Sequence, residues 1–253
     1  MLYTPNCCNK LHPRLIAFDL DGTLTKPQSP IEPQNLQFLE QMSKRYHLVI
    51  IGAGSCRRIF EQIKHFQIDI IGNYGMEGAE YDAEKDDIRM IFSHTVPLQP
   101  EPRGREVMEQ RIHRLRHMFG FTDYVGESAE FYASGCVTFP ILGTAAPLDR
   151  KMALDPDRTI RRPLLARVRE VIPEYNVFIG GTSSFDFTPA GFDKYHALAE
   201  YCRVHGYTHE EVLFSGDDYG DGGNDASVYT SEIAFLPVHD YHQLPTLYKA
   251  FLN

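Results

Sequence analysis

Two kinds of hydrophobic pattern alternate along the first third of the chain. Continuous apolar runs, which are typical of strands buried on both faces, alternate with segments whose apolar residues recur at helical spacing. The apolar runs are at 15–20, 47–54 and 68–75, and the helical segments are at 33–46 and 57–66. Strands that alternate with helices of this length predict parallel strands joined by right-handed crossovers. We therefore expect an α/β fold with a Rossmann-like parallel sheet.

The middle of the chain has a different pattern. Strand-like segments with polar connections occur at 79–98, 128–142 and 176–189, and amphipathic helical segments at 104–120 and 162–172. Strands and helices grouped in this way are typical of an α+β module. After Gly191 the first pattern returns, with a helix at 194–206 and strands at 211–218 and 232–238. We predict an α+β domain inserted at about 84–189 into a core formed by 1–83 and 190–253.

The composition excludes some classes of protein. A formal net charge of -9 over 253 residues argues against a protein that binds nucleic acid or an anionic membrane. The N-terminal segment has neither the apolar run of a signal peptide nor a membrane span, and this favours a cytoplasmic protein. The five cysteines lack the spacing of a zinc site, and we expect free thiols.

The first candidate site lies where the first predicted strand ends, in the segment "LIAFDLDGT". In parallel sheets, ligands bind outside the carboxyl ends of the strands. Two carboxylates held close there, Asp19 and Asp21, would raise each other's pKa unless a cation lay between them, and such oxygen ligands suit Mg²⁺. Asp19 could then attack phosphorus while Asp21 donates and recovers a proton at the leaving oxygen. The alternative is a structural acid in an ordinary Asp-Gly turn.

Two further segments could complete a phosphate site. Gly54 and Ser55 follow the second strand and open a helix, where a hydroxyl and backbone N–H groups suit a phosphoryl oxygen. An ordinary serine N-cap is the alternative interpretation. Lys194 opens the helix that follows the insertion, where the helix dipole favours anions. A lysine there is easier to explain if it balances Asp19 and a phosphate than as a solvated surface residue.

The glycine-rich segment "FSGDDYGDGGND" follows the apolar residues of a late strand. Asp217, which is nearest the strand end, could complete a Mg²⁺ site with Asp19 and the backbone carbonyl of Asp21. Asn224 and Asp225 could orient waters or Lys194. The alternatives are a flexible acidic loop and a calcium loop, but the spacing lacks the final glutamate of an EF-hand.

The order "DLDGT", "GAGS", "DK" and "GDDYGDGGND" resembles the haloacid dehalogenase superfamily of aspartate-based phosphotransferases. Within it, "GGTSSFDFTPAGFDK" is similar to the eukaryotic-type phosphomannomutases, which carry an α/β cap of type C2B. The resemblance implies that Asp19 is the phosphorylated nucleophile and Asp21 the acid/base. It also implies Mg²⁺ held by Asp19, Asp217 and the Asp21 carbonyl, and sugar contacts from Ser184 and Asp186 in the cap.

The chain departs from this family at the arginines that hold the distal phosphate of the substrate. Gln28, Tyr132 and Thr144 occupy three of those positions. A bidentate contact between guanidinium and phosphate cannot be replaced in kind by Gln, Tyr or Thr. We therefore expect water to accept the phosphoryl group and a phosphatase acting on a sugar phosphate or similar phosphomonoester, with Tyr132 among the cap residues that contact it.

Two alternatives stay open. A hexose phosphate mutase with a rearranged phosphate clamp would need other cap cations, for which the candidates are Arg150, Lys151, Arg158, Arg161 and Arg162. A non-catalytic protein that binds a phosphorylated ligand is less favoured, because the set of Asp19, Asp21, Lys194 and Asp217 is intact. The expected partner is a small phosphorylated molecule, and the sequence leaves the oligomeric state open, a homodimer included.

Overall fold

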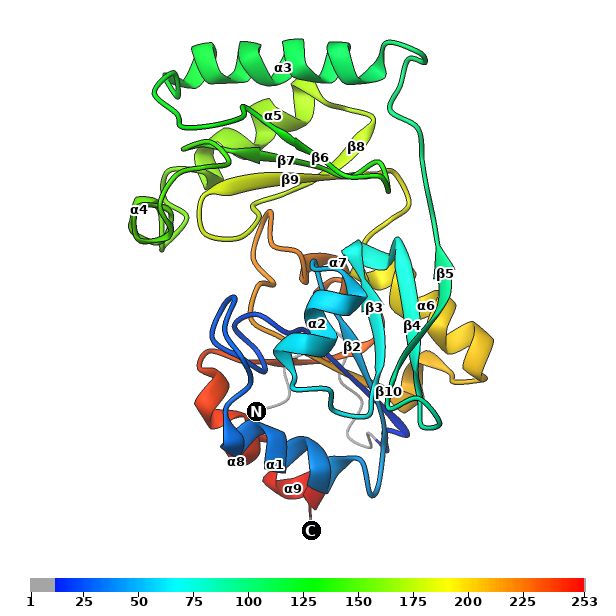
Figure 1. Cartoon of the computed structure of the whole chain (residues 1–253). Coiled ribbons are helices and arrows are strands. Elements are labelled where there is room, and N and C mark those ends of the chain that lie inside the picture. Colours follow the sequence, from blue (N-terminus) through cyan, green and yellow to red (C-terminus); the bar gives the residue numbers. More distant parts are fainter. Residues whose placement is uncertain (1–11, 253) are drawn as a thin grey trace. The chain divides into compact units, whose positions relative to one another are not determined.

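The computed structural model describes residues 12–252 and divides them into two compact units (Figure 1). The core unit comprises 12–93, 193–220 and 225–252, and the inserted unit comprises 94–192 and 221–224. Each unit has its own sheet and its own hydrophobic core.

The core unit contains a seven-stranded sheet in the order β11-β10-β1-β2-β3-β4-β5. Its parallel strands are β1 (Leu15–Phe18), β2 (His47–Ile51), β3 (Asp69–Gly72), β10 (Val212–Gly216) and β11 (Ala234–Pro237). Two antiparallel strands, β4 (Glu77–Asp82) and β5 (Asp87–Ser93), extend the sheet at one edge. The central strands β1 and β10 are buried along their whole length, which explains their continuous apolar sequences.

Helices cover both faces of this sheet. They are α1 (Pro33–Met42), α2 (Cys56–Gln62), α6 (Lys194–His205), α7 (Ala226–Tyr229), α8 (Leu244–Leu247) and α9 (Lys249–Leu252), with short 3-10 turns at Asn73–Gly75, His209–Glu211 and Tyr241–Gln243. Phe38 of α1 packs in one core cluster with Ile16 and Phe18 of β1. On the other face, Leu198 of α6 packs with Ala17. The predicted α/β class with a parallel-sheet core is confirmed.

The inserted unit contains a four-stranded antiparallel sheet in the order β6-β7-β9-β8. The strands are β6 (Glu130–Phe131), β7 (Val137–Pro140), β8 (Tyr175–Phe178) and β9 (Ser184–Pro189), and the helices are α3 (Gly104–Phe119), α4 (Leu148–Leu154) and α5 (Leu165–Val171), with a 3-10 turn at Arg162–Leu164. Helices α3 and α5 cover one face of the sheet (Figure 1). The core between them includes Ile112, Val168 and Phe185.

The predicted boundaries of 84 and 189 differ from this division. Strand β5 pairs with β4 in the core sheet, so the inserted unit begins at His94 and its main segment ends at Phe192. It also includes 221–224, from the loop that follows β10. There the backbone N–H of Ile179 donates to the carbonyl of Gly222 at 2.8 Å, and a Cβ on Gly222 would lie 2.6 Å from Leu165.

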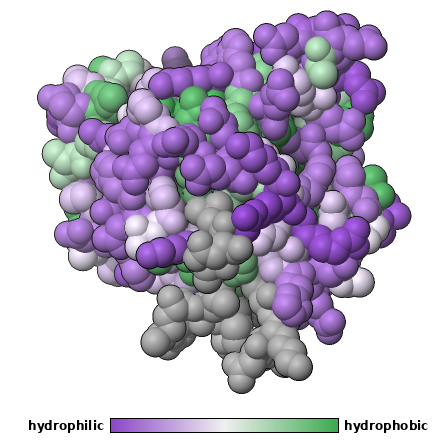
Figure 2. Space-filling view, turned by 90° about the horizontal axis from the view of Figure 1, so that it is seen from below, coloured by the Kyte–Doolittle hydropathy of each residue, from purple (hydrophilic) through white to green (hydrophobic). Residues whose placement is uncertain are grey.

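Some further expectations concern the surface and the cysteines. Figure 2 shows a face covered mainly by hydrophilic residues. Of the helices in 12–252, none has the length and apolar character needed to cross a bilayer. Cys56, Cys136 and Cys202 are buried and lie outside any disulfide bond, as predicted, whereas Cys7 and Cys8 lie outside the described residues.

Candidate active site

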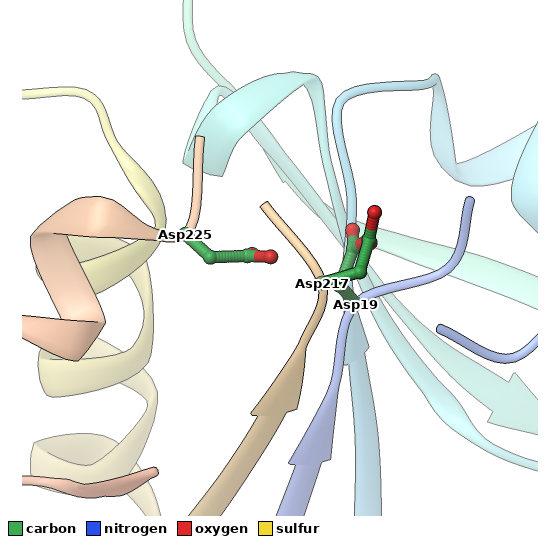
Figure 3. A group of neighbouring side chains, drawn as sticks. All are labelled: Asp19, Asp217 and Asp225. Atoms are coloured by element: carbon green, nitrogen blue, oxygen red, sulfur yellow. The ribbon is translucent and has the colours of Figure 1, made fainter. Parts of the chain in front are cut away.

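The carboxyl ends of two neighbouring parallel strands bring Asp19 and Asp217 together (Figure 3). Phe18 is in register with Ser215, and the backbone N–H of Asp19 donates to the Ser215 carbonyl at 2.8 Å. Asp217 follows Gly216, the last residue of β10. Together with Asp225, these residues place three carboxylate oxygens within 4.8 Å of one another. The structure therefore joins two segments almost 200 residues apart into one acidic site.

Lys194 provides the positive charge at this site. It is the first residue of α6 and is 0% exposed, and its Nζ donates to Oδ1 of Asp19 at 2.5 Å and to Oδ1 of Asp225 at 2.7 Å. Burial alone would lower the pKa of Lys194, but the carboxylates of Asp19 and Asp225 outweigh it and raise that pKa. The helix is capped by Asp193, which accepts from the His196 N–H at 2.9 Å. Lys194 is thus a buried ion-pair partner and not a solvated lysine.

Asp225 organises the loop after β10. Its Oδ2 accepts from the backbone N–H of Asp218 at 2.9 Å, and its own N–H donates to the Asp218 carbonyl at 2.9 Å. Because its other oxygen accepts from Lys194, both oxygens of Asp225 have protein partners. Asn224, which we expected beside it in an orienting role, belongs to the inserted unit.

Asp19 and Asp217 belong to a group of carboxylates that could hold a metal ion. Burial raises the pKa of Asp19 although Lys194 lowers it, and the charges of Asp225 and Asp217 raise it further. Burial, followed by the charge of Asp225, raises the pKa of Asp217 to about 6, although Thr23 Oγ1 donates to its Oδ1 at 3.1 Å. Two carboxylates that repel each other in this way can bind a divalent cation, which prefers oxygen ligands and would stabilise the ionised form of both side chains.

Gly22 allows Asp217 to approach the turn after β1. Its φ of 97° is in the region that favours glycine, and a Cβ there would lie 2.4 Å from Oδ2 of Asp217. Glycine is therefore favoured at position 22 for two reasons: its backbone conformation and the space that it leaves for the Asp217 carboxylate.

Asp21, the second acid of the opening pair, is held by hydrogen bonds on both of its oxygens. Oδ1 accepts from the backbone N–H of Gln28 and from Nε2 of Gln62, each at 2.8 Å. Oδ2 accepts from Nη2 of Arg58 at 2.9 Å. Arg58 and Gln62 were not predicted from the sequence. Their spacing of four residues on the helix after Ser55 was the available signal, because it places both on one helix face.

Ser55 is the N-cap of α2, and its Oγ accepts from the backbone N–H of Arg58 at 3.2 Å. The alternative interpretation of this serine is therefore structurally correct. The hydroxyl proton is not used by this bond, so a phosphate role is compatible with it. Gly54 lies against the guanidinium of Arg58, since a Cβ on Gly54 would be 2.2 Å from Nε.

The expected cap residues lie in the inserted unit. Ser184 and Asp186 are two positions apart on β9 and share a face of the sheet. Oδ1 of Asp186 accepts from Thr138 Oγ1 at 3.0 Å and from Ser184 Oγ at 3.2 Å. Tyr132 follows β6, and burial raises the pKa of its hydroxyl. The register aligns Glu130, Thr138 and Asp186 in one row. In the described part of the sheet, this row offers hydroxyls and carboxylates but no cation.

Some cationic side chains of the inserted unit have structural partners. Arg161 is 1% exposed, and it donates to Oδ2 of Asp155 and to the Ser184 carbonyl, each at 2.9 Å. Lys151 donates to the Thr144 carbonyl at 2.9 Å, and Arg116 donates to the Pro140 and Ile141 carbonyls. Arg150 lies exposed on α4.

Two family models and several curated relatives match this chain. The family model described as eukaryotic phosphomannomutase matches residues 106–237, and that of haloacid dehalogenase-like hydrolases matches 16–100. A phosphomannomutase of Nicotiana benthamiana is 29% identical over 229 residues, covering 87% of this chain and 86% of the relative. That of Solanum lycopersicum is 27% identical over 225 residues, covering 85% and 84%.

Solved structures share the fold at low sequence identity. The IMP-nucleotidase of Plasmodium falciparum, bound to IMP, superposes with a TM-score of 0.72 at 13% identity, over 95% of this chain and 68% of that chain. A structure described as part of a phosphoryl-transfer superfamily superposes with a TM-score of 0.61 at 14% identity, over 94% and 98%. The chain belongs to the eukaryotic phosphomannomutase family, within the haloacid dehalogenase superfamily of phosphoryl-transfer enzymes.

Proposed function

We propose that this protein is a Mg²⁺-dependent phosphatase that hydrolyses a sugar phosphate or a similar phosphomonoester through an aspartyl phosphate on Asp19. The observation that supports this most strongly is the group formed by the buried residues Asp19, Lys194 and Asp225 with the half-buried Asp217. A carboxylate that is buried, paired with a lysine and faced by a second acid suits nucleophilic attack on phosphorus.

In this mechanism a carboxylate oxygen of Asp19 forms a bond to phosphorus while the bond to the leaving oxygen breaks. Asp21 donates its proton to that oxygen, then takes a proton from the water that hydrolyses the aspartyl phosphate. Lys194 holds Asp19 in place and offsets the charge of the phosphoryl group. Ser55 Oγ would donate to a phosphoryl oxygen, beside Gly54. Mg²⁺, held by Asp19, Asp217 and the Asp21 carbonyl, would neutralise charge on the transferring group.

Hydrolysis is favoured over mutase chemistry by the polar face of the inserted sheet. A mutase must hold the second phosphate of a bisphosphate intermediate, and each charge-assisted contact to it is worth about 1.5–3 kcal/mol. The row of Glu130, Thr138 and Asp186 suits sugar hydroxyls better than a phosphate. Arg161, one of the alternative cations, has structural partners. We infer that Ser184, Asp186 and Tyr132 contact the sugar.

A phosphomannomutase is the second candidate. The relatives at 27–29% identity carry that name, and they match over 84–86% of their own length. The exposed Arg150 on α4 is a cation that a rearranged clamp could use.

The decisive experiment supplies hexose 1-phosphate and Mg²⁺, with and without a hexose bisphosphate. Release of inorganic phosphate that does not need the bisphosphate is expected for the phosphatase. Bisphosphate-dependent formation of the 6-phosphate would instead identify a mutase. Asp19→Asn should abolish either reaction, and unchanged turnover in this variant would contradict the assignment of the nucleophile.

A further inference from the structure

The carboxylate of Asp21 is fixed by three donors. Oδ1 accepts from the Gln28 N–H and from Gln62 Nε2, and Oδ2 accepts from Arg58 Nη2, at distances of 2.8–2.9 Å. Aspartate is otherwise free to rotate about two side-chain torsions, and hydrogen bonds to both oxygens remove that freedom. The side chain is therefore held in one orientation although it is not fully buried.

Two of the three donors come from a single helix. Arg58 and Gln62 are one turn apart on α2, so their side chains lie on the same face. Gln62 is buried, and its Nε2 also donates to Thr25 Oγ1 at 2.8 Å. Thr25 in turn forms a β-bridge with Asp21. Gln62 thus ties the turn after β1 to α2 at two points.

Arg58 is placed by the backbone around it. Its N–H donates to Ser55 Oγ at 3.2 Å, at the start of the helix. Its guanidinium lies against Gly54, where a Cβ would be only 2.2 Å from Nε and 2.4 Å from Nη2. Glycine at position 54 leaves room for the guanidinium of Arg58 in this orientation. The segment before the helix therefore helps to place the Arg58 side chain.

We propose that Arg58 and Gln62 are positioning residues that hold the Asp21 carboxylate for proton transfer to the leaving oxygen. This inference rests on the proposed function, in which Asp21 is the acid/base. Proton transfer needs the acid within about 2.6–3.2 Å of the oxygen that it protonates, so a rotating carboxylate would rarely be in place. In this role Arg58 acts through Asp21, to which its Nη2 donates at 2.9 Å.

The test compares two esters whose leaving groups differ in their need for a proton. The alkoxide of a hexose 1-phosphate must be protonated as it leaves, whereas p-nitrophenolate leaves as a stable anion. We expect Arg58→Gln to lower kcat/KM about 10- to 100-fold on the hexose phosphate and to change it by less than about threefold on p-nitrophenyl phosphate. This ratio reports the phosphorylation of Asp19 and not the later hydrolysis step, which both esters share. Arg58→Lys should recover part of the loss, and Gln62→Leu should show the same selectivity.

Arg57 provides a matched control. It is the preceding residue on α2, and it pairs with Asp87 at 2.6 Å instead of Asp21. Arg57→Gln removes the same charge from the same helix and should leave both reactions unchanged. In an Asp21→Asn background, Arg58→Gln should have no further effect on the hexose phosphate, because its target is already gone.

Equal losses of kcat/KM on both esters would overturn the proposal, because they would assign Arg58 to the phosphoryl group. An undiminished effect in the Asp21→Asn background would overturn it as well. A wild-type protein that hydrolyses neither ester would contradict the proposed function instead. In that case crystal structures of wild type and Arg58→Gln would decide, since an identical Asp21 carboxylate position in both would show that Arg58 does not hold it.

Discussion

The ammonium of Lys194 lies 2.5 Å from Oδ1 of Asp19, although 175 positions separate the two residues in the chain. Both are buried, and Asp225 completes the group as a second carboxylate partner of the lysine. One cation is thus shared by two buried acids, with Asp217 as a third acid nearby. This group, the turn beside it and the inserted sheet are each open to a direct test.

Lys194→Met should destabilise the protein strongly and abolish turnover. Removing one partner of a buried ion pair leaves carboxylates uncompensated, at a cost of about 3–5 kcal/mol in the free energy of unfolding. Denaturant unfolding measures this loss. Lys85→Met removes a surface lysine whose side chain is 72% exposed, and it should change stability by less than about 1 kcal/mol. Equal effects of the two substitutions would contradict the assigned role of Lys194.

Asp217 should make the stability of the metal-free protein fall as pH rises. Its folded-state pKa is about 6, above the unfolded value of about 3.9, so its contribution is complete below pH 4 and is lost as pH rises through 6. Between pH 4 and 7.5, wild type should lose about 1–3 kcal/mol relative to Asp217→Asn. Urea unfolding at several pH values checks this, and Asp123→Asn, which changes an exposed acid, should follow wild type.

Mg²⁺ should reverse this dependence, because it binds the ionised carboxylates. We expect its affinity to weaken below pH 6 and EDTA to abolish phosphate release. If the free energy of unfolding depended on pH in the same way with and without Mg²⁺, the metal assignment would be contradicted.

Gly22→Ala should impair the acidic site as well as the turn. Alanine at a φ of 97° is strained by roughly 1–2 kcal/mol, and its Cβ would collide with the carboxylate of Asp217. Gly206→Ala is the control, since Gly206 also has a positive φ, 73°, but a methyl group added there would meet no neighbouring atom within 4 Å. Both variants should lose stability, but only Gly22→Ala should lose the rise in melting temperature caused by Mg²⁺. The same Mg²⁺ response in both would refute the steric argument.

Asp186→Ala should discriminate between substrates. If the inserted sheet contacts the sugar, this variant should lower kcat/KM for a hexose phosphate about 10-fold or more and leave p-nitrophenyl phosphate unaffected. Thr138→Val removes a donor to Asp186 and should have a smaller effect in the same direction. Equal losses on both esters would indicate that Asp186 acts on the fold and not on the sugar.

The core sheet and its acidic site were largely predictable, for a topological reason. Buried parallel strands read as apolar runs, and residues just past their carboxyl ends must meet at one edge of the sheet. Asp19 and Asp217 follow two such strands, so the positions of the apolar runs predicted that the two residues lie close together. Lys194 could be added because a lysine at the beginning of a helix needs anions nearby.

Other features could not be read from local patterns. The hairpin of β4 and β5 has exposed residues, such as Met90 and Ile91, and nothing in its sequence says which sheet it joins. Arg58 and Gln62 contact Asp21 across 37 and 41 positions, and such pairings depend on how a helix is rotated against its sheet. The roles of the site residues remain predictions that the experiments above address.

The assignment of 221–224 to the inserted unit has a practical consequence for building chimeras within the family. A graft that exchanges only 94–192 would leave Gly222 facing a foreign partner in place of Ile179 and Leu165. The resulting mismatch would fall three residues from Asp225. Transplanting a different specificity onto this scaffold therefore requires two pieces of the donor sequence, and the shorter piece is only four residues long.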